Sequence, residues 1–186
     1  LVFPDPNLVV FLHRYASMLR GRIVLELGCG QGHNLGLFAS LGFPFIALDF
    51  TEEAIAWAKR HHPCYWSYGA ILEQDWRDPW PWIGEEDSSP LGLVVDIRGL
   101  TYGGKTVAAR MIDRVYEALE PGGLYFGKFW GEKTNRPFGD LVPDKYDTGT
   151  LRRYFSRFKE MDLMSIQMHR VRTDQYEQEW VVIARK

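Results

Sequence analysis

The sequence contains only two cysteines in 186 residues, Cys29 and Cys64, and they do not form a C-x-x-C pair. Neither a disulfide scaffold nor a thiolate zinc site is therefore expected. His61 and His62 lie close to Cys64, but no second pair of ligands accompanies them, so we expect no metal site. A chain so poor in cysteine suits a reducing compartment, and we expect a cytoplasmic location.

An excess of charge and a long apolar run are also missing. The formal net charge is -2, and acidic and basic residues are interspersed. A nucleic-acid partner is therefore not expected. No apolar run approaches the length of a membrane span and no signal peptide is visible, so we expect no membrane partner. The length fits one domain over residues 1–186.

Apolar runs alternate with helix-like runs along the chain, and turn residues separate them. Strands are predicted at residues 22–27, 43–49, 70–74, 91–97, 123–130, 163–172 and 177–186. The clearest helix follows Lys105, where apolar residues from Ala108 to Leu119 recur at helical spacing until EPGG ends it. The pattern predicts an α/β fold with a doubly wound, mostly parallel seven-stranded sheet, helices on both faces and an antiparallel C-terminal hairpin.

Residues 24–32, VLELGCGQG, place an apolar strand directly before glycines at alternate positions, and a helix-like run follows. Such glycines let the backbone approach a ligand, and the free N–H groups of the helix point towards it. A dinucleotide-binding turn needs its third glycine at position 33, where His33 stands, so NAD is disfavoured. The second strand ends in Asp49, where a carboxylate can accept hydrogen bonds from ribose hydroxyls.

A second glycine-rich stretch competes with the first. Residues 99–106, GLTYGGKT, fit the phosphate-binding pattern G-x-x-x-x-G-K-[ST] and also follow a strand. A phosphate loop normally follows the first strand of its sheet, and a later strand supplies an Asp for magnesium. After this stretch only residues 123–130 and the closing hairpin remain, and neither ends in such an Asp. We therefore interpret it as a glycine-rich connection into a helix.

At the first of these turns the sequence resembles the class I S-adenosylmethionine-dependent methyltransferases, from about Gly21 to the C-terminus. The resemblance implies a Rossmann-like methyltransferase fold and S-adenosylmethionine as cofactor, with S-adenosylhomocysteine as product. In the family, the acid matching Glu26 helps to hold the amino end, that matching Asp49 binds ribose, and that matching Asp75 contacts adenine. The residues that would line the cofactor are Glu26, Gly28, Cys29, Gly30, Gly32, Asn34, Asp49, Phe50, Asp75, Trp76 and Asp96.

The exit of the fourth strand, DIRGLTY, is similar to the same place in bacterial small-molecule methyltransferases of the family. Asp96 is our candidate base for an acceptor hydroxyl, and Arg98 and Tyr102 are candidates for positioning the acceptor. The family's arginine usually follows the Asp directly, whereas Ile97 takes that place here. Asp96 can equally well cap the next turn. Lys128 in the fifth strand can anchor an anionic acceptor, or only pack along a helix-covered face.

Two segments are candidates for covering the site. Residues 1–20 combine a proline-rich lead-in with an amphipathic helix, and in related enzymes such a segment folds over the cofactor. Residues 131–149 form a long connection for a compact domain, and we predict a substrate lid there. The side chains expected near the site from these segments are Phe3, His13, Arg136, Phe138 and Tyr146.

Two alternative functions stay open. Enzymes that methylate the ribose 2′-hydroxyl of RNA use a Lys-Asp-Lys-Glu tetrad, and Asp96, Lys128 and Glu179 resemble three of its members, although the first lysine is missing. A protein that binds the cofactor without chemistry would keep the same glycines and Asp49. We expect instead a single methyltransferase domain that methylates a small polar or anionic metabolite by in-line displacement, as a monomer or a homodimer.

Overall fold

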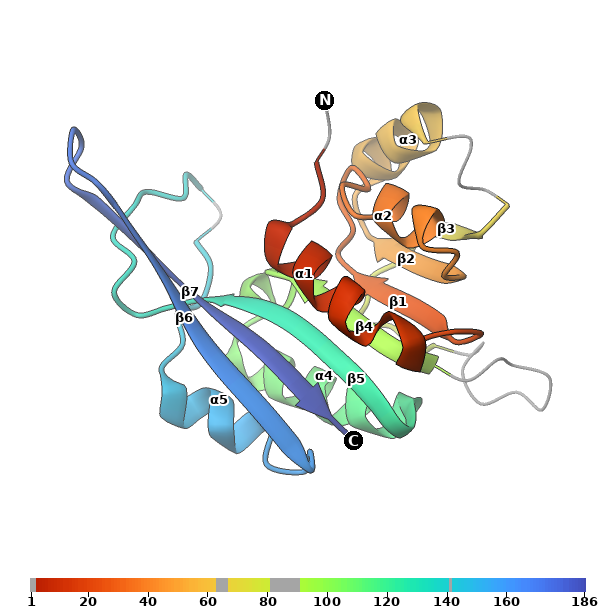
Figure 1. Ribbon diagram of the computed structural model, residues 1–186. Coiled ribbons are helices and arrows are strands. Elements are labelled where there is room, and N and C mark those ends of the chain that lie inside the picture. Colours follow the sequence, from red (N-terminus) through yellow and green to blue (C-terminus); the bar gives the residue numbers. More distant parts are fainter. Residues whose placement is uncertain (1–2, 63–66, 81–90, 141) are drawn as a thin grey trace.

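The computed structural model describes residues 3–62, 67–80, 91–140 and 142–186 (Figure 1). These residues form one sheet with seven strands, in the order β3–β2–β1–β4–β5–β7–β6. The strands are β1 (Ile23–Leu27), β2 (Phe45–Asp49), β3 (Gly69–Glu73), β4 (Leu91–Ile97), β5 (Leu119–Trp130), β6 (Glu160–Arg170) and β7 (Gln175–Arg185). Neighbours among β1 to β5 are parallel, and β7 is antiparallel to β5 and to β6. The predicted fold class and closing hairpin are confirmed.

Helices cover both faces of the sheet. They are α1 (Pro6–Tyr15), α2 (Leu35–Ser40), α3 (Glu52–His61), α4 (Lys105–Ala118) and α5 (Thr148–Tyr154), with the 3₁₀ turns η1 (Ala16–Met18) and η3 (Leu100–Tyr102). Leu8, Phe38 and Ile55 pack α1, α2 and α3 onto one face, and Met111 and Leu151 pack α4 and α5 onto the other. The sheet is therefore doubly wound, as predicted. Within the described residues, no helix has the length and hydropathy that crossing a bilayer requires.

The segment before β1 forms the expected amphipathic helix. Asp5 caps α1, because its Oδ1 accepts hydrogen bonds from the N–H groups of Asn7 at 3.0 Å and Leu8 at 3.2 Å. Phe11 is buried against Phe126 of β5, with 4.9 Å between the ring centroids. Helix α1 is therefore held against the middle of the sheet.

Strand β5 begins at Leu119 rather than at the predicted residue 123. Leu119 pairs with Leu91, and the register shifts before Leu93 pairs with Leu124. The extra residues turn at Gly122, whose φ of 80° favours glycine. This early pairing extends β5 directly from the end of α4.

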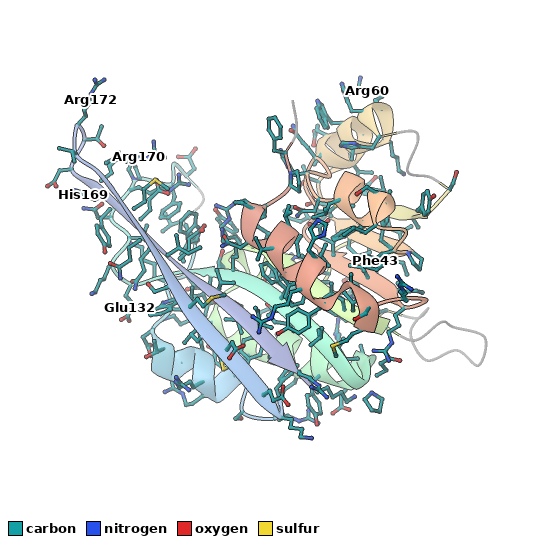
Figure 2. The ribbon with its side chains drawn as sticks, in the orientation of Figure 1. Phe43, Arg60, Glu132, His169, Arg170 and Arg172 are labelled. Carbon is teal, nitrogen blue, oxygen red and sulfur yellow. The ribbon has the colours of Figure 1, made fainter. Side chains whose placement is uncertain are left out.

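The β6–β7 hairpin extends beyond the end of β5. The last pair between β5 and β7 is Trp130 with Glu179. Beyond it, residues 167–170 of β6 pair with residues 175–178 of β7. We call these two segments, with the turn at 171–174, the hairpin arm. The arm projects past the end of the sheet (Figure 1), and its tip carries His169, Arg170 and Arg172 (Figure 2).

Candidate active site

A cleft lies at the carboxyl ends of β1, β2 and β4, where the strand order reverses. It consists of two cavities of about 330 and 410 Å³. The smaller, the β2 cavity, is lined by residues that include Asp49, Phe50, Asp75, Trp76 and Tyr102. The larger, the α1 cavity, is lined by residues that include 3–6, Glu26, Cys29, Gly30, His33 and Asn34. Both share Gly28, Ile97 and Arg98, and doubly wound sheets bind ligands at this position.

The glycine turn after β1 forms the floor between the two cavities. Gly28, Gly30 and Gly32 have φ values of 68°, 53° and 77°, a region that side chains disfavour. A Cβ atom on Gly28 would lie 3.4 Å from the Cα atom of Gly99. The turn therefore brings bare backbone to the centre of the cleft, as the sequence predicts.

Asp49 holds the glycine turn from the end of β2. Its Oδ2 accepts a hydrogen bond from the N–H of Gly30 at 2.8 Å, and its Oδ1 accepts one from the N–H of Thr51 at 2.9 Å. A carboxylate oxygen can accept more than one hydrogen bond. Asp49 can therefore keep the turn in place and still accept hydrogen bonds from a vicinal diol in the β2 cavity.

Glu26 lies at the other end of the cleft and is only 2% exposed. Its Oε1 accepts a hydrogen bond from the Nδ2 of Asn34 at 2.6 Å. Its Oε2 is buried and has no partner among the described residues. Burial, with smaller contributions from the carboxylates of Asp96 and Asp49, raises the pKa of Glu26 to about 8, against the opposing Asn34 hydrogen bond. An ammonium group would satisfy this oxygen.

The residues expected around adenine line the β2 cavity, but they differ in exposure and in their partners. The carboxylate of Asp75 forms an ion pair with Arg77, whose hydrogen bonds lower the pKa of Asp75. Trp76 is buried and packs in the core, while Phe50 and Tyr102 are exposed at 64% and 43%. Asp75 is therefore already paired, which the sequence did not predict.

Asp96 does not line either cavity. It is 0% exposed; its Oδ1 accepts a hydrogen bond from the N–H of Leu100 at 3.1 Å, and its Oδ2 accepts one from the hydroxyl of Tyr125 at 3.2 Å. Burial raises the pKa of Asp96 to about 7, although these hydrogen bonds lower it. This geometry favours the turn-capping alternative over a role as base or cofactor ligand.

Four charged side chains form a compact cluster beside the cleft. Lys128 Nζ lies 2.9 Å from Asp5 Oδ2 and 2.6 Å from Glu179 Oε2. Arg98 Nη1 lies 3.1 Å from Glu179 Oε1, and its guanidinium lies 5.2 Å from the ring centroid of Trp130. The two cations and two anions balance. Lys128 is consequently paired rather than free to anchor an acceptor, and only Arg98 and Asp5 of this cluster line the cleft.

The structure does not assemble the tetrad of the RNA enzymes. Asp96 is opposite Gly127 and Ile97 is opposite Lys128 in the β4–β5 ladder. Because successive side chains of a strand point to opposite faces, Asp96 and Lys128 lie on opposite faces of the sheet. Lys128 and Glu179 do form an ion pair, but Asp96 is not part of it.

Among the described residues, only the first of the two predicted covering segments lines the cleft. Residues 3–6 line the α1 cavity, and the N–H of Asp5 donates a hydrogen bond to Asn34 Oδ1 at 2.9 Å. In contrast, Tyr146 is buried against Phe129, with 5.2 Å between ring centroids, and the N–H of Asp144 donates to the carbonyl of Thr101. The other expected lid residues, Arg136 and Phe138, pack on Trp130, and none of the three lines either cavity.

Sequence interpretation missed Asp5, Gln31 and His33, which all line the α1 cavity. Asp5 had a local signal, since an Asp directly before a proline that opens a helix is a helix-capping pattern. No local signal in the sequence indicated its pairing with Lys128. The other glycine-rich stretch, residues 99–106, forms η3 and the start of α4, and Lys105 Nζ lies 5.7 Å from the ring centroid of Tyr146.

Both histidines near the end of α3 have protein partners, and His62 Nε2 lies 3.2 Å from the carbonyl oxygen of Gln31. His61 Nδ1 lies 2.8 Å from the carbonyl oxygen of Trp57, and the two rings stack. Cys64 lies outside the described residues. Among those described, no three His, Cys, Asp or Glu side chains are grouped to hold a metal ion.

Comparison with known proteins agrees with the fold. The sequence model of the methyltransferase domain family matches residues 24–123. A probable S-adenosylmethionine-dependent methyltransferase of Mycolicibacterium smegmatis is 37% identical over 54 residues, which are 29% of this chain and 21% of that protein. A protein of the same description from Mycobacterium tuberculosis H37Rv is 37% identical over 54 residues, covering 29% of this chain and 20% of its own length. The matched segment thus spans about a fifth of these relatives.

Solved structures match nearly the whole chain. A SAM-dependent methyltransferase from Archaeoglobus fulgidus has a TM-score of 0.76 at 14% identity, over 97% of this chain and 93% of that one. A methyltransferase from Methanosarcina mazei has a TM-score of 0.72 at 16% identity, over 99% and 98%. These identities support the fold alone, whereas the family match covers more than half of the sequence. The chain therefore belongs to the methyltransferase domain family, as a class I S-adenosylmethionine-dependent methyltransferase.

Proposed function

We propose that this chain transfers a methyl group from S-adenosylmethionine to a small polar or anionic metabolite. The observation that carries the proposal is the junction of the two cavities at Gly28, Ile97 and Arg98. A ligand with an amino-acid end and a nucleoside end fits the pair, because a buried carboxylate lies at one end and a carboxylate at a strand end lies at the other. When bound, S-adenosylmethionine supplies a methyl group on a positively charged sulfur.

The residues of the cleft divide into binding roles. Glu26 accepts hydrogen bonds from the ammonium group through Oε2, which has no partner in the described part of the chain. Asp49 accepts hydrogen bonds from the ribose hydroxyls, and the turn at Gly28 lets the backbone lie close to the ligand. Residues 3–6 line the amino-acid end of the cleft.

Arg98 is the residue that we assign to the acceptor. Its φ of 70° is unfavourable for a residue with a side chain and costs about 1–3 kcal/mol. The ion pair with Glu179 and the contact with Trp130 hold the side chain in this position. Its remaining N–H groups are available to an acceptor oxygen, so a carboxylate or another polar group suits this place. Lys128 then acts as a positioning residue, because it orients Glu179.

The proposal is tested first by calorimetric titration with S-adenosylhomocysteine, with magnesium-ATP and NAD as parallel ligands. Binding of the first alone is expected, and binding of ATP alone would contradict the assignment of the glycine turn. A panel of small hydroxylated, amino and carboxylated acceptors is then incubated with S-adenosylmethionine, and S-adenosylhomocysteine formation is measured. Binding without turnover of any acceptor would favour a non-catalytic cofactor-binding protein.

Two variants separate the acceptor site from the turn beneath it. Arg98→Ala is expected to lower turnover about tenfold or more, since acceptor orientation is lost, while cofactor affinity changes little. Asp96→Asn is expected to keep most of the turnover, because its amide oxygen can still accept the N–H of Leu100. A large loss of turnover in Asp96→Asn with a stable fold would restore Asp96 as the base.

A further inference from the structure

Strand β6 leaves an open edge at the end of the sheet. It pairs with β7 without interruption from Glu160 to Arg170, and no other described strand lies beside it. Natural edge strands are commonly protected by bulges, proline or charged residues, because open backbone groups attract another strand. The central segment 163–168, LMSIQM, contains none of these.

The same strand exposes apolar side chains on one face. Met164 and Met168 are 47% and 49% exposed, and they flank Ile166, which packs against the core on the α1 side. Because alternate residues share a face, these three lie in one row. The outer part of the row belongs to the hairpin arm, where the arm extends beyond β5 (Figure 1).

The row is complementary to a second copy of itself. If two β6 strands pair antiparallel about Ile166, Met164 of one lies opposite Met168 of the other, and Asp162 lies opposite Arg170. Asp162 has no ion-pair partner among the described residues. Arg170 shares the carboxylate of Glu177 with Arg136, at 3.2 and 3.7 Å. Each copy therefore offers an unpaired anion where its twin offers a cation in excess.

We propose that the chain forms a two-fold symmetric dimer in which β6 pairs antiparallel with β6 of a second copy, centred on Ile166. The two sheets become one continuous sheet, and the hairpin arm of each copy lies along residues near Asp162 of the other. The interface is isologous, so every contact occurs twice. The cleft at β1 and β4 lies away from this edge in the strand order, so both copies keep it free.

Charge reversal tests the complementarity. Analytical ultracentrifugation is expected to show a dimer for the native chain, and Arg170→Asp or Asp162→Arg is expected to raise the dimer dissociation constant on the order of tenfold or more. The double variant Asp162→Arg/Arg170→Asp is expected to regain most of the affinity. Controls with the same charge change are Arg152→Asp and Asp140→Arg, both at exposed positions outside β6. A monomeric native chain, or a dimer that both single reversals leave unchanged, would overturn the proposal.

Cysteine cross-linking tests the register. Directly opposite residues of antiparallel strands have Cα atoms about 4.5–5.5 Å apart, within the range of a disulfide. In a Cys64→Ser background, where the remaining Cys29 is buried, Ile166→Cys is expected to form a covalent dimer under mild oxidation. Ser165→Cys should form far less, and the reverse result would overturn pairing about Ile166. Titration of the Arg170→Asp variant with S-adenosylhomocysteine is expected to match the native chain, so the dimer and the methyltransferase function are tested separately.

Discussion

Glu26 makes cofactor binding depend on pH, and Glu26→Gln should remove that dependence. In the free protein the buried carboxyl has a pKa of about 8, so it is mostly protonated at neutral pH. To accept a hydrogen bond from an ammonium group through Oε2 while Asn34 donates to Oε1, it must first lose this proton. Binding of S-adenosylhomocysteine is therefore coupled to the release of a proton from the protein.

The size of the effect follows from the pKa. Each pH unit below the pKa costs about 1.4 kcal/mol, so deprotonation costs about 1.4 kcal/mol at about pH 7 and about 2.7 kcal/mol at about pH 6. Affinity should thus rise about ninefold between about pH 6 and 7 and about fivefold between about pH 7 and 8. The rise levels off above about pH 8, because Glu26 is then mostly ionised in the free protein and the amino group of the ligand begins to lose its own proton.

Calorimetry in buffers with different ionisation enthalpies measures the protons released directly. The native chain should release about 0.9 proton per ligand at about pH 7. Glu26→Gln should release no proton from this site, and it should bind S-adenosylhomocysteine more weakly at about pH 8 by roughly 1.5–3 kcal/mol. Its affinity should no longer change with pH below about pH 8. A native chain that binds without proton release, or a variant with the native pH profile, would refute the coupling.

The same proton affects the stability of the free protein. The folded state keeps it up to about pH 8, whereas the same carboxyl in the unfolded chain, with an ordinary pKa of 4.5, releases it much earlier. Because the unfolded chain binds fewer protons in this window, the free energy of unfolding should fall as pH rises from about 4.5 to 8. The fall should be smaller in Glu26→Gln, which urea denaturation at both ends of the window measures.

Two further variants test the ribose site and the charge cluster beside the cleft. Asp49→Ala should weaken S-adenosylhomocysteine binding by about 1–3 kcal/mol, because it leaves the N–H of Gly30 and the ligand hydroxyls unpaired. Asp49→Asn should lose less binding free energy than Asp49→Ala. If calorimetry finds equal affinity for Asp49→Ala and the native chain, Asp49 does not bind the ribose. Lys128→Met should lower the free energy of unfolding by about 3–5 kcal/mol, since it leaves Asp5 without its cation and Glu179 with Arg98 alone. Urea denaturation measures this, with exposed Lys159→Met as the control, and the added change Glu179→Gln should recover part of the loss.

Much of the fold could be predicted because its signals are local. Apolar runs such as residues 91–97 identify buried parallel strands, and EPGG identifies the end of α4. The start of β5 at Leu119 could not be predicted, because it depends on pairing with Leu91 across the sheet. Leu119 lies between the end of α4 and the turn at Gly122, and only its pairing with a neighbouring strand makes it part of β5.

In the candidate site, too, the features with local sequence signals were predictable and those that depend on distant contacts were not. The glycine turn and Asp49 were predictable, because the turn geometry requires glycine and a strand end places the acid. The environment of Asp96 was not, since which face its carboxylate takes depends on the β4–β5 register. Nor could any local pattern predict that Lys128 is paired with Asp5, 123 residues earlier.

That pairing also bears on how the chain acquires its structure during synthesis. Helix α1 is made before Lys128 and Glu179, which complete the cluster around its capping residue. Contacts so distant in sequence must wait for the intervening chain, and they are slow to form. The apolar face of α1 therefore cannot pack against β5 and β7 until those strands have been synthesised. The closure of the α1 cavity is consequently a late event in folding.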